Sequence, residues 1–464
     1  MVDAFSTNSL ETIEKQINDL KLIEITDIDS YFEIDRTTKW ILDNNFKRVA
    51  LQFPDELLHS SVKVYSKLQL NCSECSFFIL ADTSYGNCCV DLVAAEHYEA
   101  DCIIHYGHSC LSPVEKLPTL LIFDKSPLNL NSINQEIDKL KGKLIVFYDV
   151  SYQYLHSEIV KLFQNNNEIF ISDIILPGSV SPSEYKVLFS RRLPTDLKNS
   201  SDSYSFFYIG NKTSFKNGFL FYFNKNKFYQ YDPEIGSCEE ILFNKTNREL
   251  MKRYYLIEKA KDSAIFGILI GTMSVAKYKD AIEHVSKILK KVQKRYYSFL
   301  IGKLNCPKLN NFMEVDTYVL VACNENSLID SKELNKPIIT IYELEMAFNC
   351  ARLWGEEYVV DFKHLLENSE HYVPLKLSEQ ESDVSLITGE SRFNRRVDNE
   401  TKEETESALL SRDKTLIVQN YSASDFLRNR SWTGLEQNLG QDEIKKAIEG
   451  TKGIAAGYES EPIK

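Results

Sequence analysis

The same order of strands and helices occurs three times along this chain, and each time the third strand follows an aspartate. These segments read DCIIHYGHSC from Asp101, DSYSFFYIGN from Asp202 and DTYVLVACNE from Asp316, at a spacing of about a hundred residues. Apolar runs rich in β-branched and aromatic residues, separated by amphipathic stretches, are typical of parallel α/β units. The pattern therefore predicts internal triplication, and a length of 464 residues agrees with several cores.

The predicted fold class is α/β, with three similar parallel-sheet α/β domains in a pseudo-threefold arrangement and a polar C-terminal extension. We expect strands at 49–53, 77–80, 102–106, 119–123, 144–148, 168–172, 205–210, 265–271, 297–302, 317–323 and 337–342. We expect helices at 56–68, 152–163 and 277–292, and one directly after Asn87. The expected parts are a polar helical arm at 1–30, domains at 31–128, 129–255 and 256–370, and an acidic linker with a docked tail at 371–464.

Charge and hydropathy exclude several classes of protein. The formal net charge of −13 argues against broad nucleic-acid binding, which requires a basic surface. The N-terminal stretch lacks the apolar core of a signal peptide, and the longest apolar run, near 264–276, is too short to cross a bilayer. We therefore expect a cytoplasmic protein without membrane contact, whose reduced thiols are buried apolar groups or metal ligands.

The cysteines are distributed unevenly over the three repeats. Four of the ten lie within residues 81–110, whereas none occurs between Cys110 and Cys238. Cys88, Cys110 and Cys323 each follow a predicted strand, and ligands of parallel sheets collect beyond the carboxyl ends of strands. If the three units face one another, thiolates from separate loops converge there and could hold zinc, copper(I) or an iron–sulfur cluster.

Cys88 and its neighbour Cys89 follow the dipeptide Gly86-Asn87, which reads as a turn and helix N-cap. Both thiols would then lie in the first helical turn, where the helix dipole lowers the thiol pKa and favours thiolate. Adjacent residues point in different directions on a helix, so we expect only one of the two to bind a given cluster. The spacing does not choose between them, and buried packing is the competing interpretation.

The other candidates have weaker signals. Cys72 and Cys75 have CxxC spacing without the second pair that a zinc ribbon needs, so an exposed loop is the simpler interpretation. The remaining candidates are expected to be structural; they are Cys238, Cys306, Cys350, His97, His105 and His108. A flavodoxin-like or nucleotide-binding enzyme is disfavoured, because residues 52–60 contain no glycine and no phosphate-binding motif occurs.

Several long motifs resemble one known family. ALQFPDELL (50–58), DTSYGNCCVD (82–91) and HYGHSCLSP (105–113) are similar to the diphthamide synthesis proteins, the subunits of 2-(3-amino-3-carboxypropyl)histidine synthase. The later motifs resemble the eukaryotic subunit 2 branch; they are VDTYVLVACNENSL (315–328), PIITIYELEMAFN (337–349), VSLITGE (384–390), RSWTGLE (430–436) and KGIAAGYE (452–459). The resemblance covers the chain from about residue 30 to its end.

The resemblance implies a fold, a cofactor and a reaction. It implies three α/β domains around a 4Fe-4S cluster, with one cluster cysteine in each domain of a catalytic subunit. It implies cleavage of S-adenosylmethionine, the co-substrate of the complex, and transfer of its 3-amino-3-carboxypropyl group to a histidine of translation elongation factor 2. This is the first step of diphthamide formation. The expected partners are subunit 1 of a heterodimer, elongation factor 2 and an electron-donating reductase system.

The chain departs from the catalytic pattern in its middle repeat. Residues 179–192 resemble the loop that carries the middle cysteine but contain none. The resemblance then implies cluster ligands Cys89, Cys110 and Cys323, with Cys88 close behind Cys89, and no catalytic residue in this chain. The implied role is to keep the partner's cluster reduced, with an open iron site less well shaped for substrate. The alternative is a metal-free scaffold that stabilises its partner.

Overall fold

The computed structural model describes residues 25–393 and two short strands near the C-terminus. Within 25–393 the description omits 82, 84, 138, 141, 164–167, 178–184, 199–203, 330–335, 355–356 and 378–381. The chain divides into a unit of residues 1–400 and a unit of residues 401–464. In the second unit the described residues form the strands β18 (Gly453–Ile454) and β19 (Gly457–Tyr458), which pair antiparallel. Most of the predicted N-terminal arm and of the docked tail lies outside the described residues.

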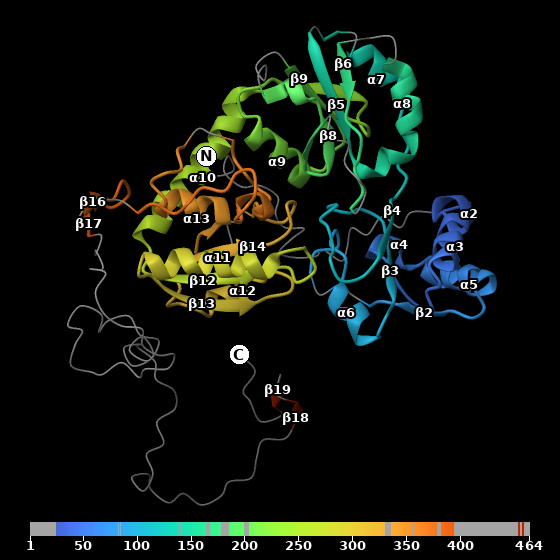
Figure 1. Ribbon diagram of the computed structural model, residues 1–464, viewed down its shortest axis with the longest axis horizontal. Helices are drawn as coiled ribbons and strands as arrows, with labels where there is room; N and C mark the ends of the chain where they lie inside the picture. The colour runs from blue at the N-terminus through green and yellow to red at the C-terminus, as the bar shows by residue number, and fades with distance from the viewer. Residues whose placement is uncertain are drawn as a thin grey trace, which may run out of the picture. The chain divides into compact units, whose positions relative to one another are not determined.

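The first sheet, which belongs to the blue part of the chain in Figure 1, has the strand order β2-β1-β3-β4 with all three pairs parallel. Its strands are β1 (Arg48–Gln52), β2 (Ser76–Ile79), β3 (Cys102–Tyr106) and β4 (Thr119–Ile122). The helices of this part are α2 (Ile28–Tyr31), α3 (Ile34–Asp43), α4 (Asp55–Leu58), α5 (Ser61–Asn71) and α6 (Leu92–His97). β3 is buried along its whole length, as expected of a central parallel strand.

The second sheet has the order β11-β10-β9-β5-β6. Its strands are β5 (Lys143–Tyr148), β6 (Ile169–Ile171), β9 (Tyr204–Ile209), β10 (Phe228–Asp232) and β11 (Ser237–Ile241). A separate antiparallel pair is formed by β7 (Lys186–Leu188) and β8 (Arg191–Leu193). The helices are α7 (Leu130–Ile137), η3 (Val150–Leu155), α8 (His156–Phe163), η4 (Thr195–Lys198) and α9 (Thr213–Tyr222).

The third sheet has the order β13-β12-β14-β15 and is parallel throughout. Its strands are β12 (Ile265–Ile270), β13 (Arg295–Leu300), β14 (Thr317–Val321) and β15 (Ile338–Ile339). The helices are α10 (Phe243–Asp262), α11 (Tyr278–Lys291), α12 (Cys306–Asn310), α13 (Ile341–Phe348) and η6 (Phe362–Leu365). Alternate residues of β12 and β14 pack toward α11 and α13 on one face and toward α12 on the other.

The three sheets share one strand order, in which the second strand lies at the edge and the first strand pairs with the third. The α/β prediction with several parallel sheets is therefore confirmed, while the pseudo-threefold arrangement and the domain limits remain predictions. The repeated aspartate has a structural reason. The Asp101 carboxylate accepts bonds from the backbone N–H of Lys47 and Arg48, and Asp316 accepts from Ala264 and Ile265. In the first and third sheets this aspartate thus caps the start of the first strand from the start of the third, while Asp202 of the second repeat lies outside the described residues.

The prediction of a purely parallel middle sheet is wrong at one edge. β11 pairs antiparallel with β10, and it contains Cys238. The two strands are joined by the short segment 233–236, which ends on Gly236 at a φ of 73°. A link this short allows only an antiparallel hairpin, because a parallel pair needs a crossover of a dozen or more residues.

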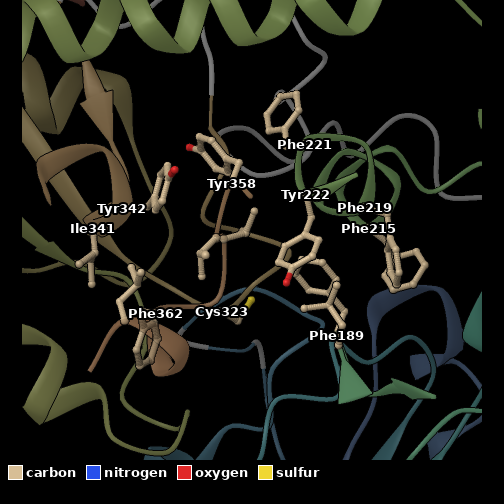
Figure 2. Close-up of a cluster of buried hydrophobic side chains, with 14 of the residues drawn as sticks. Phe189, Phe215, Phe219, Phe221, Tyr222, Cys323, Ile341, Tyr342, Tyr358 and Phe362 are labelled. Atoms are coloured by element: carbon tan, nitrogen blue, oxygen red, sulfur yellow. The ribbon is translucent and has the colours of Figure 1, made fainter. Parts of the chain in front are cut away.

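Aromatic side chains fill the space between the second and third sheets (Figure 2). Phe215 and Phe219 of α9 pack with Phe189 in one buried cluster, which also includes Tyr342 and Tyr358 from the third part of the chain. Cys323 lies within this cluster, as do Cys88, Cys89 and Cys110 from the first part. One continuous apolar cluster therefore joins the second and third sheets to the cysteine loops of the first part.

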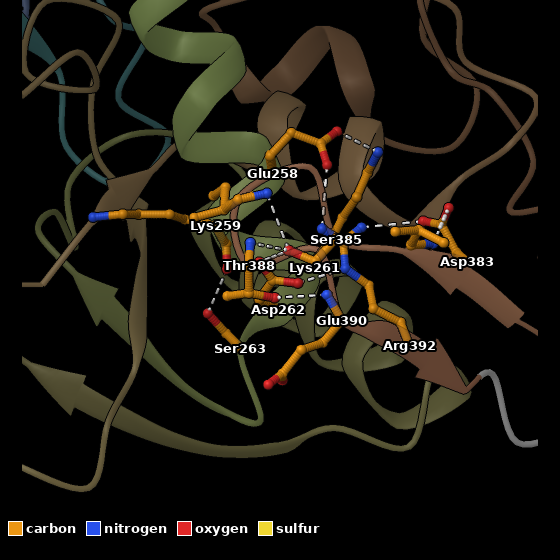
Figure 3. Close-up of polar contacts among 12 residues, drawn as sticks. Glu258, Lys259, Lys261, Asp262, Ser263, Asp383, Ser385, Thr388, Glu390 and Arg392 are labelled. Carbon is orange, nitrogen blue, oxygen red and sulfur yellow. Dashed lines mark hydrogen bonds and ion pairs between the residues drawn. The ribbon is translucent and has the colours of Figure 1, made fainter.

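A hairpin follows the third sheet, inside the stretch that the sequence predicts as acidic linker (Figure 3). Its strands are β16 (Ser382–Val384) and β17 (Ser391–Phe393). Arg392 pairs with Glu258 and Asp262 at the end of α10, and with Asp383 across the hairpin. The Ser385 hydroxyl also donates to Asp262 at 2.8 Å. These contacts anchor the hairpin on α10.

Gly267 in β12 provides a direct test of packing in the third sheet. A methyl group at this position would overlap the ring of Tyr318 and approach Phe299 to 3.0 Å. Overpacking of a dense core costs about 1 to 3 kcal/mol, so we expect Gly267→Ala to lower the free energy of unfolding by that amount. Gly271→Ala is the matched control, because its nearest neighbour is a flexible leucine side chain 3.2 Å away. Equal urea midpoints for the two variants would contradict this packing.

None of the described helices is long and apolar enough to cross a membrane.

Candidate metal centre

Two of the candidate cysteines follow the central strands of the first and third sheets. After β3 the chain turns at Gly107, with a φ of 89°, and reaches Cys110 three residues later. After β14 it reaches Cys323 within two residues. Both thiols therefore lie beyond the carboxyl ends of parallel strands, as predicted, and both side chains are at most 5% exposed.

Cys88 and Cys89 lie in a turn and not in a helix, which corrects the prediction from sequence. The helix α6 begins at Leu92, and its N-cap is Asp91, whose side chain accepts from the N–H of Ala94. The proposed dipole effect on these thiols is therefore absent. The turn is fixed by Gln52, which donates to the Cys89 carbonyl at 2.9 Å and accepts from the Asp91 N–H at 2.8 Å.

The four sulfurs converge in one place. All four Sγ atoms lie within 4.8 Å of one another. The Cys88 sulfur is 3.7 Å from that of Cys323 and 3.9 Å from that of Cys89, and the Cys89 sulfur is 3.8 Å from that of Cys110. Adjacent residues point in different directions on a helix, but this turn brings the sulfurs of Cys88 and Cys89 to the same place. The group forms a complete set of four soft donors.

A cavity of about 220 Å³ is lined by three of these cysteines, Cys88, Cys89 and Cys110. Its other lining residues are apolar or carry hydroxyls; they include Ser112, Val114, Leu117, Thr119, Pro177 and Ser274. No described residue that lines it carries a charged side chain. The thiols now touch one another, so a larger inorganic group would require them to move apart, and the cavity offers room for that movement.

Hydrogen bonding makes the four thiols unequal. The pKa of the Cys110 thiol lies well below its usual range, because Cys323, Cys88 and Cys89 can donate to its sulfur. The pKa values of Cys88 and Cys89 are raised, chiefly because both donate to Cys110. One thiolate is therefore stabilised before any metal binds, and thiolate is the form that ligates metals.

The histidines near the sulfurs bind other partners, as the sequence predicts. His105 Nε2 contacts the Asn87 carbonyl at 3.2 Å. His108 Nε2 lies 2.7 Å from Glu325, and its Nδ1 lies 3.6 Å from Asp149, so it joins loops of all three sheets. Burial disfavours the charged imidazole, but the Glu325 carboxylate outweighs burial and raises the pKa of His108 to about 9.

The remaining cysteines lie outside the sulfur group. Cys72 and Cys75 are at most 8% exposed and pack in the core of the first part, so their predicted position in an exposed loop is wrong. Cys306 is buried at the first position of α12, and Cys350 is exposed. The middle loop without cysteine begins in 178–184, outside the described residues. Its described part continues into the β7–β8 pair.

The comparisons with known proteins agree with this geometry. The family model of diphthamide synthesis proteins matches residues 53–359. Subunit 2 of 2-(3-amino-3-carboxypropyl)histidine synthase from Danio rerio is 38% identical, over 99% of this chain and 98% of that protein. The corresponding proteins of Xenopus laevis and Schizosaccharomyces pombe are 39% and 35% identical and cover 98% and 99% of this chain. The chain belongs to the diphthamide synthesis protein family.

Within this family the chain falls with subunit 2 of the synthase, as the motifs predicted. The relatives' name, subunit 2, implies a synthase of more than one subunit. Among solved structures, Dph2 from Pyrococcus horikoshii with a 4Fe-4S cluster is similar in fold. The TM-score is 0.54 at 22% sequence identity, and the match covers 71% of this chain and 94% of that chain. This diphthamide synthesis protein thus shares its fold with a cluster-containing relative.

Sequence reasoning missed two polar side chains that hold the loops of the sulfur-bearing residues. Gln52 ends β1 and Glu325 follows Cys323, so both lie at carboxyl ends of strands, like the cysteines. That position was the available signal, because polar side chains at this edge of a parallel sheet are candidates for a site. The approach of the Cys88 and Cys89 sulfurs to the same centre gave no such signal, since it depends on a turn held by the distant Gln52.

Proposed function

We propose that this chain is the electron-supplying subunit of the synthase and holds a 4Fe-4S cluster through Cys88, Cys89, Cys110 and Cys323. The convergence of four buried sulfurs from separate loops carries this proposal. The cluster that the archaeal relative contains supports the choice of cofactor. A bound cluster of this type would supply single electrons to the partner subunit.

The number of sulfurs argues against direct catalysis by this chain. Four thiolates ligate all four irons of a 4Fe-4S cluster, whereas binding of S-adenosylmethionine through its amino and carboxylate groups needs an open iron. The cavity beside the sulfurs also offers no charged side chain, among its described lining residues, to a ligand that carries a sulfonium, an ammonium and a carboxylate. We therefore propose four cysteine ligands in place of the three that the family resemblance implies.

In the proposed scheme the reaction takes place on subunit 1. That subunit cleaves S-adenosylmethionine and transfers the 3-amino-3-carboxypropyl group to a histidine of elongation factor 2. This chain holds its cofactor in a buried position, and a cytoplasmic reductase system replaces the electron that it passes on. Burial excludes water from the sulfurs, and the protein's hydrogen bonds to them set how readily the centre accepts that electron.

A second candidate is a structural zinc site in a scaffold subunit. Four sulfurs at 2.3 Å from one zinc form a tetrahedron with edges of about 3.8 Å. Three of the sulfur–sulfur separations, at 3.7 to 3.9 Å, match that edge length. Zinc would stabilise the junction of the first and third sheets without any redox role. A metal-free scaffold, with the thiols merely packed, is the remaining alternative.

Single-turnover assays of S-adenosylmethionine cleavage under anaerobic conditions test whether subunit 1 is the catalytic subunit and this chain supplies electrons. The chain alone, subunit 1 alone and the complex are compared with dithionite as reductant. We expect cleavage by the complex, and a rate at least a hundredfold lower for this chain alone. A comparable rate for this chain alone would contradict a purely electron-supplying role. If the complex keeps full multiple-turnover activity while this chain contains zinc, the result would support the structural role of this chain as a scaffold subunit.

A further inference from the structure

We propose that Asn326 raises the reduction potential of the centre by donating a hydrogen bond to the Cys88 sulfur. Glycine at position 86 leaves the space that this amide occupies. The inference rests on the proposed function, since it assigns a role toward the cluster held by the four cysteines. It concerns the first part and the third part of the chain together, because the donor and the sulfur come from different sheets.

The contact itself is specific. Asn326 Nδ2 lies 3.4 Å from Cys88 Sγ, within hydrogen-bond range for sulfur. Its donor group is an amide, which carries no charge and does not titrate. Asn326 is also absent from the described lining of the cavity, so the amide approaches Cys88 from another side. A group in the cavity would therefore approach Cys88 from a side that the amide does not occupy.

The backbone holds Asn326 in this position. Its N–H donates to the carbonyl of Cys323 at 3.1 Å, which closes a tight turn directly after the third-sheet cysteine. The Ser327 hydroxyl bonds the same carbonyl at 2.7 Å and contacts the carbonyl of Ala322 at 3.2 Å. The amide is therefore pre-organised and loses little conformational freedom when it serves the sulfur.

Gly86 supplies the space for the amide. A Cβ built on Gly86 would overlap the side-chain nitrogen of Asn326 and lie 3.7 Å from the Cys88 sulfur. Its φ lies outside the positive range, so alanine can adopt the backbone conformation there. An alanine at this position would thus displace the amide and little else.

A second, weaker donor is present at Cys110. Its sulfur lies 3.4 Å from the Ser112 hydroxyl. A hydroxyl can rotate, so it would donate to the sulfur once Cys110 is a thiolate. Asn326 and Ser112 therefore offer hydrogen-bond donors to the sulfurs of two of the four cysteines, Cys88 and Cys110.

The physical consequence follows from charge. Reduction adds one electron, taken from dithionite in a titration, and neither makes nor breaks a bond. The added negative charge spreads onto the sulfurs, so a donor to sulfur stabilises the reduced state more than the oxidised state. Loss of the donor therefore lowers the potential and leaves the ligands in place.

The test is a potentiometric titration of the anaerobically purified full chain, monitored by electron paramagnetic resonance. At a fixed ambient potential near the wild-type midpoint, we expect the ratio of reduced to oxidised centre to fall about threefold to tenfold in Asn326→Leu. Tenfold corresponds to about 59 mV for one electron. Gly86→Ala should shift the ratio in the same direction, and Ser112→Ala by a smaller factor.

Asn324→Leu is the matched control, because this buried amide lies in the same loop and its Oδ1 has no hydrogen-bond partner among the described residues. Iron content is measured for every variant. Unchanged midpoints in both Asn326→Leu and Gly86→Ala, with full iron content, would overturn the inference and leave the proposed function intact. Absence of iron from the wild-type chain would instead overturn the proposed function, and this inference with it.

Pulsed electron paramagnetic resonance tests the hydrogen bond from Asn326 even if Asn326→Leu loses its iron. In the wild-type chain exchanged into D2O, we expect a deuteron coupled to the reduced centre that is missing in Gly86→Ala. An identical deuterium spectrum in Gly86→Ala would overturn the inference.

Discussion

Replacement of any one of Cys88, Cys89, Cys110 and Cys323 by serine is expected to remove most of the iron from this chain. The wild-type chain should hold about four irons and the variants fewer than one, because a hard hydroxyl is a poor substitute for a soft thiolate ligand. The four sulfurs are mutually within 4.8 Å, so each contributes one side of the same centre. Iron and acid-labile sulfide, measured per chain after anaerobic purification, check this expectation.

The variants at Cys88 and Cys89 distinguish a centre with three protein ligands from a centre with four. A centre with three protein ligands would tolerate loss of one of the two adjacent thiols, whereas a centre with four would not. Cys102→Ala is the matched control, because Cys102 is fully buried in β3 but lies outside the sulfur group. It should keep its iron. Full iron content in either Cys88→Ser or Cys89→Ser would contradict ligation by all four residues.

The largest effect on stability is expected at Arg253. This guanidinium from α10 lies beside Glu343 of α13 and bonds both of its carboxylate oxygens, and neither side chain is more than 5% exposed. Glu343 also accepts from Tyr358 and from the Thr340 N–H, where it completes a capping box. Arg253→Met would leave a buried carboxylate without its cation, which costs about 3 to 5 kcal/mol.

Urea unfolding at neutral pH measures this cost. The double variant Arg253→Met/Glu343→Gln should recover part of the loss, since it removes the buried charge that the single variant leaves unpaired. Lys287→Met is the control, because Lys287 pairs with Glu283 on the surface of α11 and its loss should leave the midpoint unchanged. A loss at Arg253 no larger than that at Lys287 would contradict the buried ion pair.

The sequence predicted those parts of the fold that depend on local pattern. Apolar runs located β1, β3, β5, β9, β12 and β14, because a strand buried on both faces has an uninterrupted apolar composition. The positions of Cys110 and Cys323 followed from the strands that precede them. The aspartates before β3 and β14 were visible as a repeat, but their capping role required the structure.

Other features depend on residues far apart in the sequence and could not be predicted. The turn at Cys88 and Cys89 is held by Gln52, and it replaces the helix start that Asn87 suggested. Glu343 completes the capping box at the start of α13, and its ion pair with Arg253 spans ninety positions. The hairpin of β10 and β11 was missed because its outer strand is polar and partly exposed.

The central claim is that the four thiols hold an iron–sulfur cluster, and metal analysis tests it most directly. The full chain, purified anaerobically without added metal, is analysed for iron, zinc and acid-labile sulfide, together with its Mössbauer spectrum. We predict about four irons and four sulfides per chain, the signature of a 4Fe-4S cluster, with little zinc. One zinc per chain without sulfide, and no cluster after reconstitution with iron and sulfide, would contradict the account.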